Sequence, residues 1–260
     1  MSIIYEPSGK AREYAALACN CYTGCNHACK YCYAPAIRRM TREEYKNPIP
    51  RRNILNEFEK DCRQYYWTES AVLFCFMTDP YNSAESELRI TREALKLCLK
   101  YQIPVKILTK SKTVLNDIDI IKKFGPHITV GMTLTFDNNI DSLSWEPGAS
   151  LPFERIETLK TLYNSGVHTW ASFEPVINPL QSVNMLMKVI DYVEHYKIGK
   201  LNNYKGLDKK IDWPVFLKNV IDILRGKKPF YIKKDLQENA PQILLYGNEI
   251  QADMFEPKSF

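Results

Sequence analysis

The chain has 260 residues, of which 45% are hydrophobic and 25% are charged, and its formal net charge is +5. This composition is typical of a globular protein with one large domain and a substantial core. The modest positive charge does not by itself indicate a nucleic-acid-binding protein, and no apolar run approaches the roughly 18 residues of a membrane span.

The N-terminus and the cysteines indicate the cellular compartment. Residues 1–7 contain neither the basic start nor the long apolar stretch of a signal peptide. Eight cysteines without such a signal argue against a disulfide framework. We therefore expect a cytoplasmic protein with reduced thiols and no association with a membrane.

Short apolar runs alternate with amphipathic stretches from Tyr14 onward. The run at residues 71–77 is apolar throughout and has the length of a strand buried in a parallel sheet. It ends at residues 78–82, which are rich in turn-forming residues. Six strands are expected, at residues 15–21, 71–77, 105–108, 128–135, 167–173 and 198–204.

The intervening stretches have helical periodicity. Ser111 is placed to cap one helix at its N-terminus, and Gly166 is placed to end another. Helices are expected at residues 33–42, 53–66, 84–101, 153–163, 180–196 and in the stretch after Ser111. Repeated βα units of this kind imply an α/β fold with a parallel sheet and right-handed crossovers.

The cysteine spacing at Cys25, Cys29 and Cys32 is the most informative motif, a C-x3-C-x2-C run with Tyr31 before the last cysteine. Structural zinc requires four ligands, whereas three thiolates on a short loop leave one position open. A 4Fe–4S cluster held in this way keeps one iron free for a small molecule. The alternative is a zinc knuckle in which a C-x2-C pair is completed by His27 and by Cys19 or Cys21.

This motif, with Gly24 before it and a βα pattern after it, resembles the signature loop of the radical S-adenosylmethionine (radical SAM) superfamily. The resemblance implies that Cys25, Cys29 and Cys32 bind a 4Fe–4S cluster whose free iron is chelated by S-adenosylmethionine. An electron from the cluster would cleave S-adenosylmethionine to a 5′-deoxyadenosyl radical, which takes a hydrogen atom from substrate. A flavodoxin or ferredoxin is the electron donor that the resemblance implies.

The fold implied by the resemblance is the open, partial (β/α)6 barrel of radical SAM enzymes, because six units are too few for a closed eight-stranded barrel. We assign this barrel to residues 1–205. After about residue 205 the pattern changes to one more helix, a basic stretch and a tail with two prolines. Residues 206–260 are therefore expected to be a C-terminal extension that covers the open side of the barrel.

Polar residues lie at or just beyond the carboxyl ends of several expected strands, where the chemistry of such folds is found. Each could instead be a cap or turn residue, but their shared position favours a functional role for the set. The set comprises Thr78, Asp79, Lys110, Thr133, Thr135, Ser172 and Glu174.

A wider resemblance, over roughly residues 9–200, is to the branch related to spore photoproduct lyase. It is carried by residues 9–14 (GKAREY), 78–81 (TDPY), 109–111 (TKS) and 145–150 (WEPGAS), together with Arg155.

This resemblance implies that Tyr31 lies beside the adenine of S-adenosylmethionine. Lys110 and a hydroxyl of Thr133 or Thr135 would contact its ribose or methionine part. Thr78, Asp79 and Ser172 would line the same pocket, and Arg155 could pair with the carboxylate of S-adenosylmethionine.

One departure from the lyase pattern concerns the substrate. The lyases carry a hydrogen-donating cysteine where this chain has Phe76, and strand alternation predicts that Cys75 points the other way. Short members of the branch include queuine lyase, which releases queuine from queuosine or its 5′-phosphate. The size of the chain and its late basic residues fit that activity.

We therefore expect a radical SAM lyase that abstracts hydrogen from a nucleoside or nucleotide, with queuine lyase as the specific hypothesis. Glu174 and Tyr81 are the candidate substrate contacts with catalytic roles. Asn82 and Tyr231 are further candidates, and Lys233 is a candidate phosphate contact. The late basic residues could also be no more than a solvated surface.

Alternative functions remain open at this point. One is a photoproduct-lyase-like DNA repair enzyme, and a second is a radical SAM enzyme acting on a peptide or other metabolite. A third, from another class, is a zinc-stabilised nucleic-acid-binding module. Because the charge is modest, we expect no stable binding to nucleic acid.

Overall fold

The computed structural model describes residues 2–202, 204, 206–252 and 256–260. Its centre is an eight-stranded sheet in the order β1-β2-β5-β6-β7-β8-β9-β10, in which β1 is antiparallel to β2 and the other neighbours are parallel. A second, two-stranded sheet pairs β3 with β4. The strands are β1 (Ile4–Tyr5), β2 (Leu17–Cys19), β3 (Tyr22–Thr23), β4 (Ile49–Pro50), β5 (Val72–Phe74), β6 (Val105–Thr109), β7 (Ile128–Thr133), β8 (His168–Phe173), β9 (His195–Ile198) and β10 (Phe230–Ile232).

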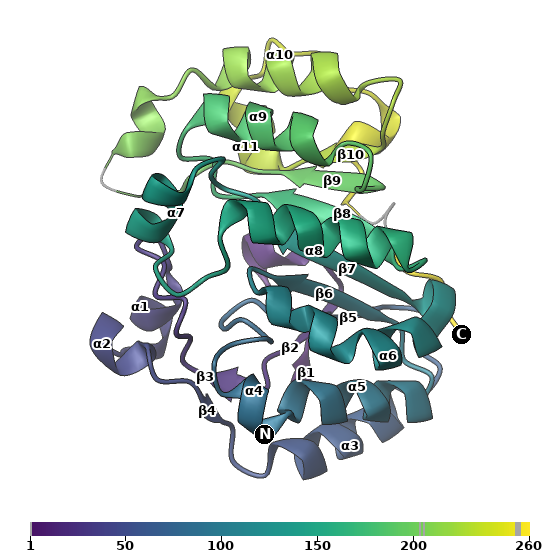
Figure 1. Ribbon diagram of the computed structural model, residues 1–260. Coiled ribbons are helices and arrows are strands. Elements are labelled where there is room, and N and C mark those ends of the chain that lie inside the picture. The colour runs from purple at the N-terminus through teal and green to yellow at the C-terminus, as the bar shows by residue number, and fades with distance from the viewer. Residues whose placement is uncertain (1, 203, 205, 253–255) are drawn as a thin grey trace.

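Helices cover one face of this sheet (Figure 1). The α-helices are α1 (Ala34–Arg38), α2 (Arg42–Tyr45), α3 (Ile54–Gln64), α4 (Glu85–Leu88), α5 (Ile90–Lys100), α6 (Ile118–Ile121), α7 (Asn139–Trp145), α8 (Pro152–Asn164), α9 (Pro179–Val189), α10 (Trp213–Leu224) and α11 (Lys234–Asn239). Short 3-10 helices are η1 (Gly9–Glu13), η2 (Lys112–Asp117), η3 (Lys122–His127), η4 (Leu207–Lys210) and η5 (Gly247–Ile250).

The expected α/β class and its parallel βα order are confirmed. β1 and β10 are the outermost strands of the sheet order. β10 comes from the segment predicted to be a C-terminal extension, and it pairs in parallel with β9. That segment therefore adds a strand directly to the sheet, while the predicted boundary at residue 205 falls on a residue outside the described ones.

Several element boundaries differ from the prediction. The helix expected at 84–101 is two helices, because Arg89 between them has φ 52°. The helix expected at 33–42 ends at Arg38, where the next residue is left-handed, and α2 follows. The strand expected at 71–77 extends only over Val72–Phe74.

The end of the helix expected at 180–196 was also wrong. The α-helix stops at Val189, but Val193 beyond it is still fully buried, so the apolar spacing continued after the backbone had left the helix. The last predicted strand lies at His195–Ile198, earlier than expected, and residue 203 of the predicted 198–204 lies outside the described residues.

Two apolar cores lie under the helices and a third fills the inner side of the curved sheet. The first core packs α3, α5 and α6 on the strands from β2 to β7, and the second packs α9 and α10 on the strands from β7 to β10. The inner cluster contains Tyr14 and Trp170, and Phe76 and Leu108 pack against it. Helices on one face and a filled inner side are the arrangement of a partial barrel.

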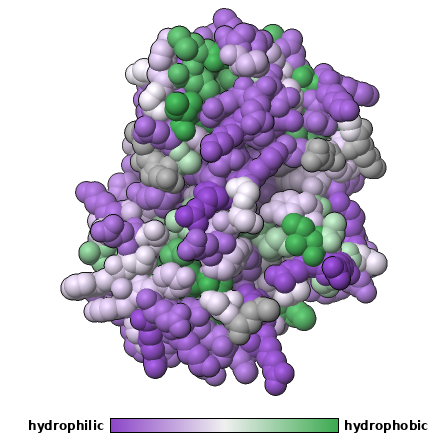
Figure 2. Space-filling model, turned by 180° about the vertical axis from the view of Figure 1, so that it is seen from behind, coloured by the Kyte–Doolittle hydropathy of each residue, from purple (hydrophilic) through white to green (hydrophobic). Residues whose placement is uncertain are grey.

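The surface is mainly hydrophilic on the side opposite to that of Figure 1, with apolar residues in separate small groups (Figure 2). Within the described residues, no helix has the length and hydrophobicity needed to cross a membrane.

The close packing inside the barrel gives a stability prediction. Gly131 on β7 pairs with Trp170 on β8, and a Cβ atom at Gly131 would lie 2.3 Å from the indole ring. The Gly131→Ala substitution should therefore destabilise the protein by roughly 1–3 kcal/mol, since the fully buried ring must shift. Urea unfolding followed by circular dichroism measures this difference.

The matched control is Ile140→Ala, because the Ile140 side chain is 82% exposed. Its free energy of unfolding should change by no more than about 0.5 kcal/mol. Equal stability of Gly131→Ala and the wild-type protein would contradict the packing of Trp170 on Gly131.

Candidate functional site

A large cavity, with a volume of about 790 Å³, opens at the carboxyl ends of the parallel strands. Ligand sites of α/β proteins lie at this edge of the sheet because each strand delivers a side chain to the same place. The polar lining comes from the ends of β5, β6, β7, β8 and β10, namely Thr78, Asp79, Thr109, Lys110, Thr133, Ser172, Glu174 and Lys233.

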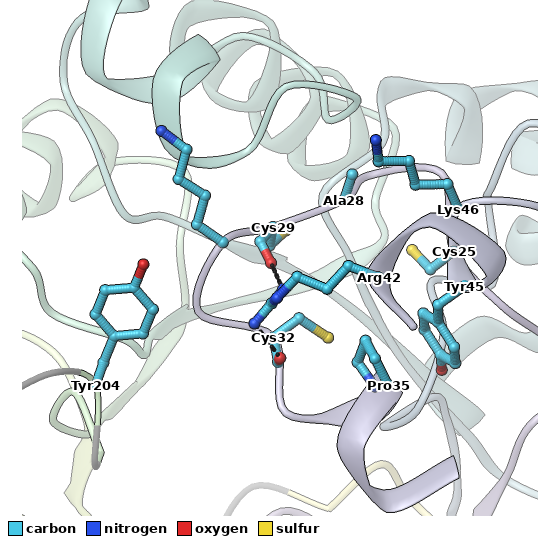
Figure 3. Close-up of a pocket in the computed structure, with 10 residues that line it drawn as sticks. Cys25, Ala28, Cys29, Cys32, Pro35, Arg42, Tyr45, Lys46 and Tyr204 are labelled. Atoms are coloured by element: carbon cyan, nitrogen blue, oxygen red, sulfur yellow. Dashed lines mark hydrogen bonds between the residues drawn. The ribbon is translucent and has the colours of Figure 1, made fainter. Parts of the chain in front are cut away.

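The cysteine loop forms another wall of this cavity. Cys25, Cys29 and Cys32 also line a second cavity of about 410 Å³, which Arg42 and Tyr204 share with the first. Figure 3 shows this second cavity, with Arg42 between Cys29 and Cys32. The three thiols therefore border two cavities.

Arg42, from the N-terminus of α2, holds the cysteine loop from the outside. Its Nη1 donates to the carbonyl oxygen of Cys29 at 3.0 Å, and its Nη2 donates to that of Cys32 at 3.1 Å (Figure 3). The planar guanidinium can span both carbonyls, which a lysine ammonium cannot do in the same geometry. This contact fixes the spacing of two thiol-bearing residues.

The last residue of α7 and the segment after it pack against the same loop through their backbone. The amide of Lys30 donates to the carbonyl of Trp145 at 2.8 Å, and the amide of Gly148 donates to that of His27 at 3.1 Å. A Cβ atom at Gly148 would lie 2.1 Å from the carbonyl oxygen of Asn26. Glycine is thus required here for close approach of two backbones.

A buried carboxylate, Glu146, joins this segment to the barrel. Oε2 accepts from Arg155 Nη2 at 2.5 Å, and Oε1 accepts from the hydroxyl of Tyr31 and from Thr135 Oγ1 at 3.1 Å. Burial opposes ionisation, but the charges of Arg155 and Lys110 and these hydrogen bonds outweigh it, so the pKa of Glu146 is below its ordinary value. Glu146 is therefore a buried anion at neutral pH.

The predicted contact between Arg155 and the carboxylate of S-adenosylmethionine does not fit this geometry. Arg155 is 2% exposed, and its three nitrogen atoms donate to the carbonyls of Ser150 and Thr133 and to Glu146. Thr135 is likewise occupied by Glu146 and does not line the cavity. Both residues support the cysteine loop through Glu146.

Asp79 has a similar role on the β5 side. Oδ1 accepts from Thr109 Oγ1 at 2.6 Å, and Oδ2 accepts from the backbone amide of Lys110 at 2.8 Å. Oδ2 also lies 3.4 Å from Nδ1 of His27, a buried histidine whose pKa is lowered by burial. Thr78 Oγ1 donates to the carbonyl of Gly24 at 2.5 Å. Thr78 and Asp79 thus line the cavity and also anchor the start of the cysteine loop.

The three thiols fit an iron–sulfur cluster by their donor chemistry. Burial raises the pKa of Cys25 to about 12 and also raises the pKa of Cys29 and Cys32. A cationic iron centre favours the thiolate over the thiol, and cysteine thiolates are the usual cluster ligands. Among the described residues, no group of three or more Cys, His, Asp or Glu side chains surrounds a single-ion site.

The remaining cofactor candidates face the large cavity. Tyr31, Lys110, Thr133 and Ser172 line it, and the ammonium of Lys110 lies 5.8 Å from the centroid of the Tyr31 ring. Of the two hydroxyls predicted as alternatives, only Thr133 lies on the cavity wall. Lys110 therefore places a cation beside the cysteine end of the cavity.

A second polar network lies on the wall formed by β8 and β10. Lys233 Nζ donates to Glu174 Oε1 and Oε2 at 3.0 and 2.8 Å. The hydroxyl of Tyr14 lies 2.6 Å from Glu174 Oε2 and 2.8 Å from Ser172 Oγ. The pKa of Tyr14 is raised well above its ordinary value, mainly by burial and then by the nearby charge of Glu174. Its hydroxyl therefore stays protonated.

Three of the predicted substrate contacts lie outside the cavity wall. Tyr81 is 2% exposed and its hydroxyl donates to Asp117, because the turn after β5 carries the side chain into the core. The side chain of Asn82 stabilises the turn, because its Nδ2 donates to the carbonyl of Asp79. Tyr231 donates to Glu13 Oε2. Tyr81 is thus a core residue and not a catalytic one.

The expectation that Cys75 points the other way from Phe76 is wrong, because both residues line the cavity. The alternation argument assumed that the strand continued to residue 77, but β5 ends at Phe74. Arg42 and Tyr14 were not singled out from the sequence. The only available signal was their position within or near the motifs, since neither lies in an expected strand end.

The comparisons with known proteins agree with this site. The model of the radical SAM superfamily matches residues 19–193, which include all three motif cysteines. The chain therefore belongs to the radical SAM superfamily. The cofactors of this superfamily are a 4Fe–4S cluster and S-adenosylmethionine, and its members are enzymes, which argues against the zinc-stabilised module.

Two relatives in sequence are described as uncharacterized proteins. An uncharacterized protein of Methanocaldococcus jannaschii is 33% identical over 65% of this chain and 63% of its own length. An uncharacterized protein of Mycobacterium tuberculosis is 24% identical over 62% of this chain and 49% of its own. The chain therefore spans between about half and two thirds of the length of these relatives.

Solved structures share the fold at low sequence identity. Streptococcus suis SuiB bound to S-adenosylmethionine has a TM-score of 0.63 at 14% identity, and the match covers 88% of this chain and 53% of SuiB. Spore photoproduct lyase complexed with dinucleoside spore photoproduct has a TM-score of 0.59 at 13% identity, and that match covers 93% of this chain and 65% of the lyase. These matches support the radical SAM fold and the likeness to spore photoproduct lyase.

The buried ion pair of Glu146 gives a prediction about stability and pH. Glu146→Gln leaves the Arg155 guanidinium buried without its counter-charge, so the protein should lose about 3–5 kcal/mol of unfolding free energy at pH 7. Because the pKa of Glu146 is lowered on folding, this contribution is complete above its unfolded pKa, about 4.3, and is lost as the pH falls through its folded pKa. Urea unfolding between pH 3.5 and 7 measures it.

Glu157→Gln on α8 is the control, because Glu157 is exposed and its removal should have little effect at any pH. A stability difference between wild type and Glu146→Gln that stays constant down to pH 3.5 would contradict the lowered pKa of Glu146 in the folded protein.

Arg42 gives a prediction about the metal centre. Arg42→Met removes both hydrogen bonds to the Cys29 and Cys32 carbonyls, so the loop should hold its ligands less firmly. By analogy with other outer-shell partners, we expect roughly 10–100-fold weaker cluster retention. Iron and sulfide per chain, followed during anaerobic challenge with a chelator, measure this. Arg38→Met on the exposed side of α1 should behave as wild type, and equal retention by all three proteins would exclude the role of Arg42.

Proposed function

We propose that this chain is a radical SAM lyase that acts on a nucleoside or nucleotide, with queuosine or its 5′-phosphate as the specific substrate and queuine as the product. One observation carries the proposal. A single cavity joins three cluster-type cysteines at one end to a Glu174–Lys233 pair on the wall formed by β8 and β10. Its volume, about 790 Å³, is in the range of sites that enclose small organic ligands.

The cofactors, when bound, supply a radical that removes one hydrogen atom from substrate. The residues of the chain bind and orient S-adenosylmethionine and the substrate and shield them from water. Cys25, Cys29 and Cys32 would hold the cluster, and Lys110 with Thr133 would bind the polar part of S-adenosylmethionine. Tyr31, whose hydroxyl is tied to Glu146, would present its ring to the adenine. A fixed ring matters because hydrogen transfer tolerates little misplacement.

The Glu174–Lys233 pair supports the substrate assignment. A carboxylate accepts hydrogen bonds from two hydroxyls of a sugar or from a ring amine, while an ammonium binds a phosphate. Lys233 is 2% exposed, so a phosphate reaching it would be bound away from bulk water. Tyr14 holds one oxygen of Glu174 and leaves the carboxylate oriented toward the cavity it lines.

The structural neighbours support the nucleoside class, since one of them is a spore photoproduct lyase bound to a dinucleoside photoproduct. Another neighbour, SuiB, is bound to a precursor peptide. A peptide substrate is therefore the competing outcome. A reduced flavodoxin or ferredoxin is the electron donor that we propose for either substrate class.

The first test concerns the cofactors. Anaerobic reconstitution should give about four irons per chain, as expected for one 4Fe–4S cluster. Electron paramagnetic resonance of the reduced protein should change when S-adenosylmethionine is added. Zinc without sulfide, and no signal, would contradict the cluster assignment.

The second test concerns the substrate. Reduced enzyme with S-adenosylmethionine and queuosine 5′-phosphate should release queuine together with 5′-deoxyadenosine. Lys233→Met removes a charged contact, so KM for the phosphate ester should rise by about 10–150-fold. KM for unphosphorylated queuosine should change far less. Lys234→Met, at the neighbouring exposed lysine, is the control.

Absence of queuine, with 5′-deoxyadenosine still formed slowly, would remove this substrate and leave the superfamily assignment intact. Stimulation of 5′-deoxyadenosine formation by a peptide but by no nucleoside would favour the peptide alternative.

A further inference from the structure

Lys200 lies just after β9 on the wall of the large cavity, and its ammonium makes no hydrogen bond within the described part of the chain. The residue is only 8% exposed. Its Nζ atom lies 3.8 Å from Asp208 Oδ2, beyond hydrogen-bond distance, and 5.5 Å from the centroid of the Trp213 ring. Buried polar groups without a hydrogen bond are rare, because their lost hydration is not replaced. Lys200 therefore keeps its donors for a group inside the cavity that it lines.

Three other buried lysines of the barrel behave differently. Lys106, Lys197 and Lys233 each donate at least two hydrogen bonds to oxygen atoms of the protein. Their ammonium groups are thus satisfied by the fold itself, and their burial needs no further explanation. Lys200 is the exception among these four, so its burial is explained better by a ligand than by the packing of the barrel.

The end of β9 brings Lys200 beside the Glu174–Lys233 pair. Gly199 precedes it, and a Cβ atom at Gly199 would lie 2.8 Å from the carboxyl carbon of Glu174. The backbone amide of Lys233 donates to the carbonyl of Ile198 at 2.9 Å, because β9 and β10 are parallel neighbours. Two ammonium groups and one carboxylate therefore share this wall of the cavity.

A third cation reaches the same wall from the N-terminal segment. Lys10 Nζ donates to Asn202 Oδ1 at 2.7 Å and to Asp235 Oδ2 at 3.0 Å, and Asn202 Nδ2 donates to the same Asp235 oxygen at 2.8 Å. Lys10 and Asn202 both line the cavity. Lys10 thus has a hydrogen-bonded counter-charge within the protein, whereas Lys200 does not.

From these contacts we infer that Lys200 is the main phosphate-binding residue of the cavity and that the substrate is a phosphate monoester. The inference rests on the proposed function and deepens it, because it selects the nucleoside 5′-phosphate over the free nucleoside. An ammonium binds phosphate as a point charge with three donors, and a phosphate ester carries a charge of about −1.5 to −2 and three acceptor oxygens. Lys233 gives two hydrogen bonds to Glu174, which leaves one donor for the same phosphate.

The test measures the binding of inorganic phosphate to the full chain by isothermal titration calorimetry, before and after anaerobic reconstitution of the cluster. Lys200→Met keeps a long apolar side chain and removes the charge, and Lys200→Arg restores a cation. The matched control is Lys209→Met, which changes an exposed lysine on η4. Acetate is titrated in the same way and tests whether a carboxylate binds equally well.

We expect Lys200→Met to bind phosphate roughly 10–150-fold more weakly, because it loses a hydrogen bond between charged groups. Lys200→Arg should recover most of this affinity, and Lys209→Met should bind as wild type. Phosphate should raise the urea midpoint of the wild-type protein but not that of Lys200→Met. Without phosphate, Lys200→Met should be at least as stable as wild type, because it removes a buried charge. A purely structural ion pair with Asp208 predicts the opposite, a less stable variant.

Unchanged phosphate affinity in Lys200→Met would overturn the phosphate site, and so would an equal loss in Lys209→Met or equal binding of acetate and phosphate. In the queuine assay, Lys200→Met should raise KM for queuosine 5′-phosphate and leave KM for queuosine nearly unchanged. Phosphate binding that depends on Lys200, without release of queuine, would keep the phosphate site and remove queuosine as the substrate. Queuine release with equal KM for both substrates would keep the proposed function and overturn the phosphate inference.

Discussion

The site depends on one buried carboxylate. Glu146 binds the Arg155 guanidinium from α8, the hydroxyl of Tyr31 from the cysteine loop and that of Thr135 after β7. Glu146 is only 1% exposed, so its negative charge needs a positive partner within the protein, because an unpaired buried ion is strongly unfavourable. The hydrogen bonds and the ion pair of Glu146 hold the cysteine loop on the barrel. The backbone contacts that Trp145 and Gly148 make with this loop are adjacent to Glu146 in the chain. The position of the thiols is therefore set by an electrostatic requirement of the core.

The loop that Glu146 positions divides the space around it into two cavities. Strand ends deliver Asp79, Lys110 and Glu174 to the larger cavity, and α2 delivers Arg42 to the boundary that both cavities share. Because the same three thiols border both cavities, a group bound to them is accessible from either cavity.

The inner side of the barrel has its own charge requirement. Lys106 and Lys197 are fully buried, and their ammonium groups donate to the carbonyl of Tyr14 at 3.1 and 3.2 Å. Glu256, from the C-terminal segment, accepts from Lys106 at 2.7 Å and supplies a counter-charge. The hydroxyl of the same Tyr14 reaches Glu174 in the cavity. Residues from both ends of the chain therefore support the proposed substrate wall, consistent with the β10 strand added by the C-terminal part.

The sequence alone determined the α/β class, the parallel βα order and the thiol loop, because hydrophobic periodicity and motif spacing are local properties of the chain. It also picked out the strand-end residues Thr78, Asp79, Lys110, Thr133 and Glu174, since parallel strands bring their carboxyl ends to one edge. Only the tertiary structure decided that Tyr81 and Arg155 are buried supports and that Cys75 lines the cavity. Those outcomes depend on where strands end and which distant groups neutralise a charge. Arg42 and Tyr14 acquire their roles from contacts that no pattern in their own segments encodes.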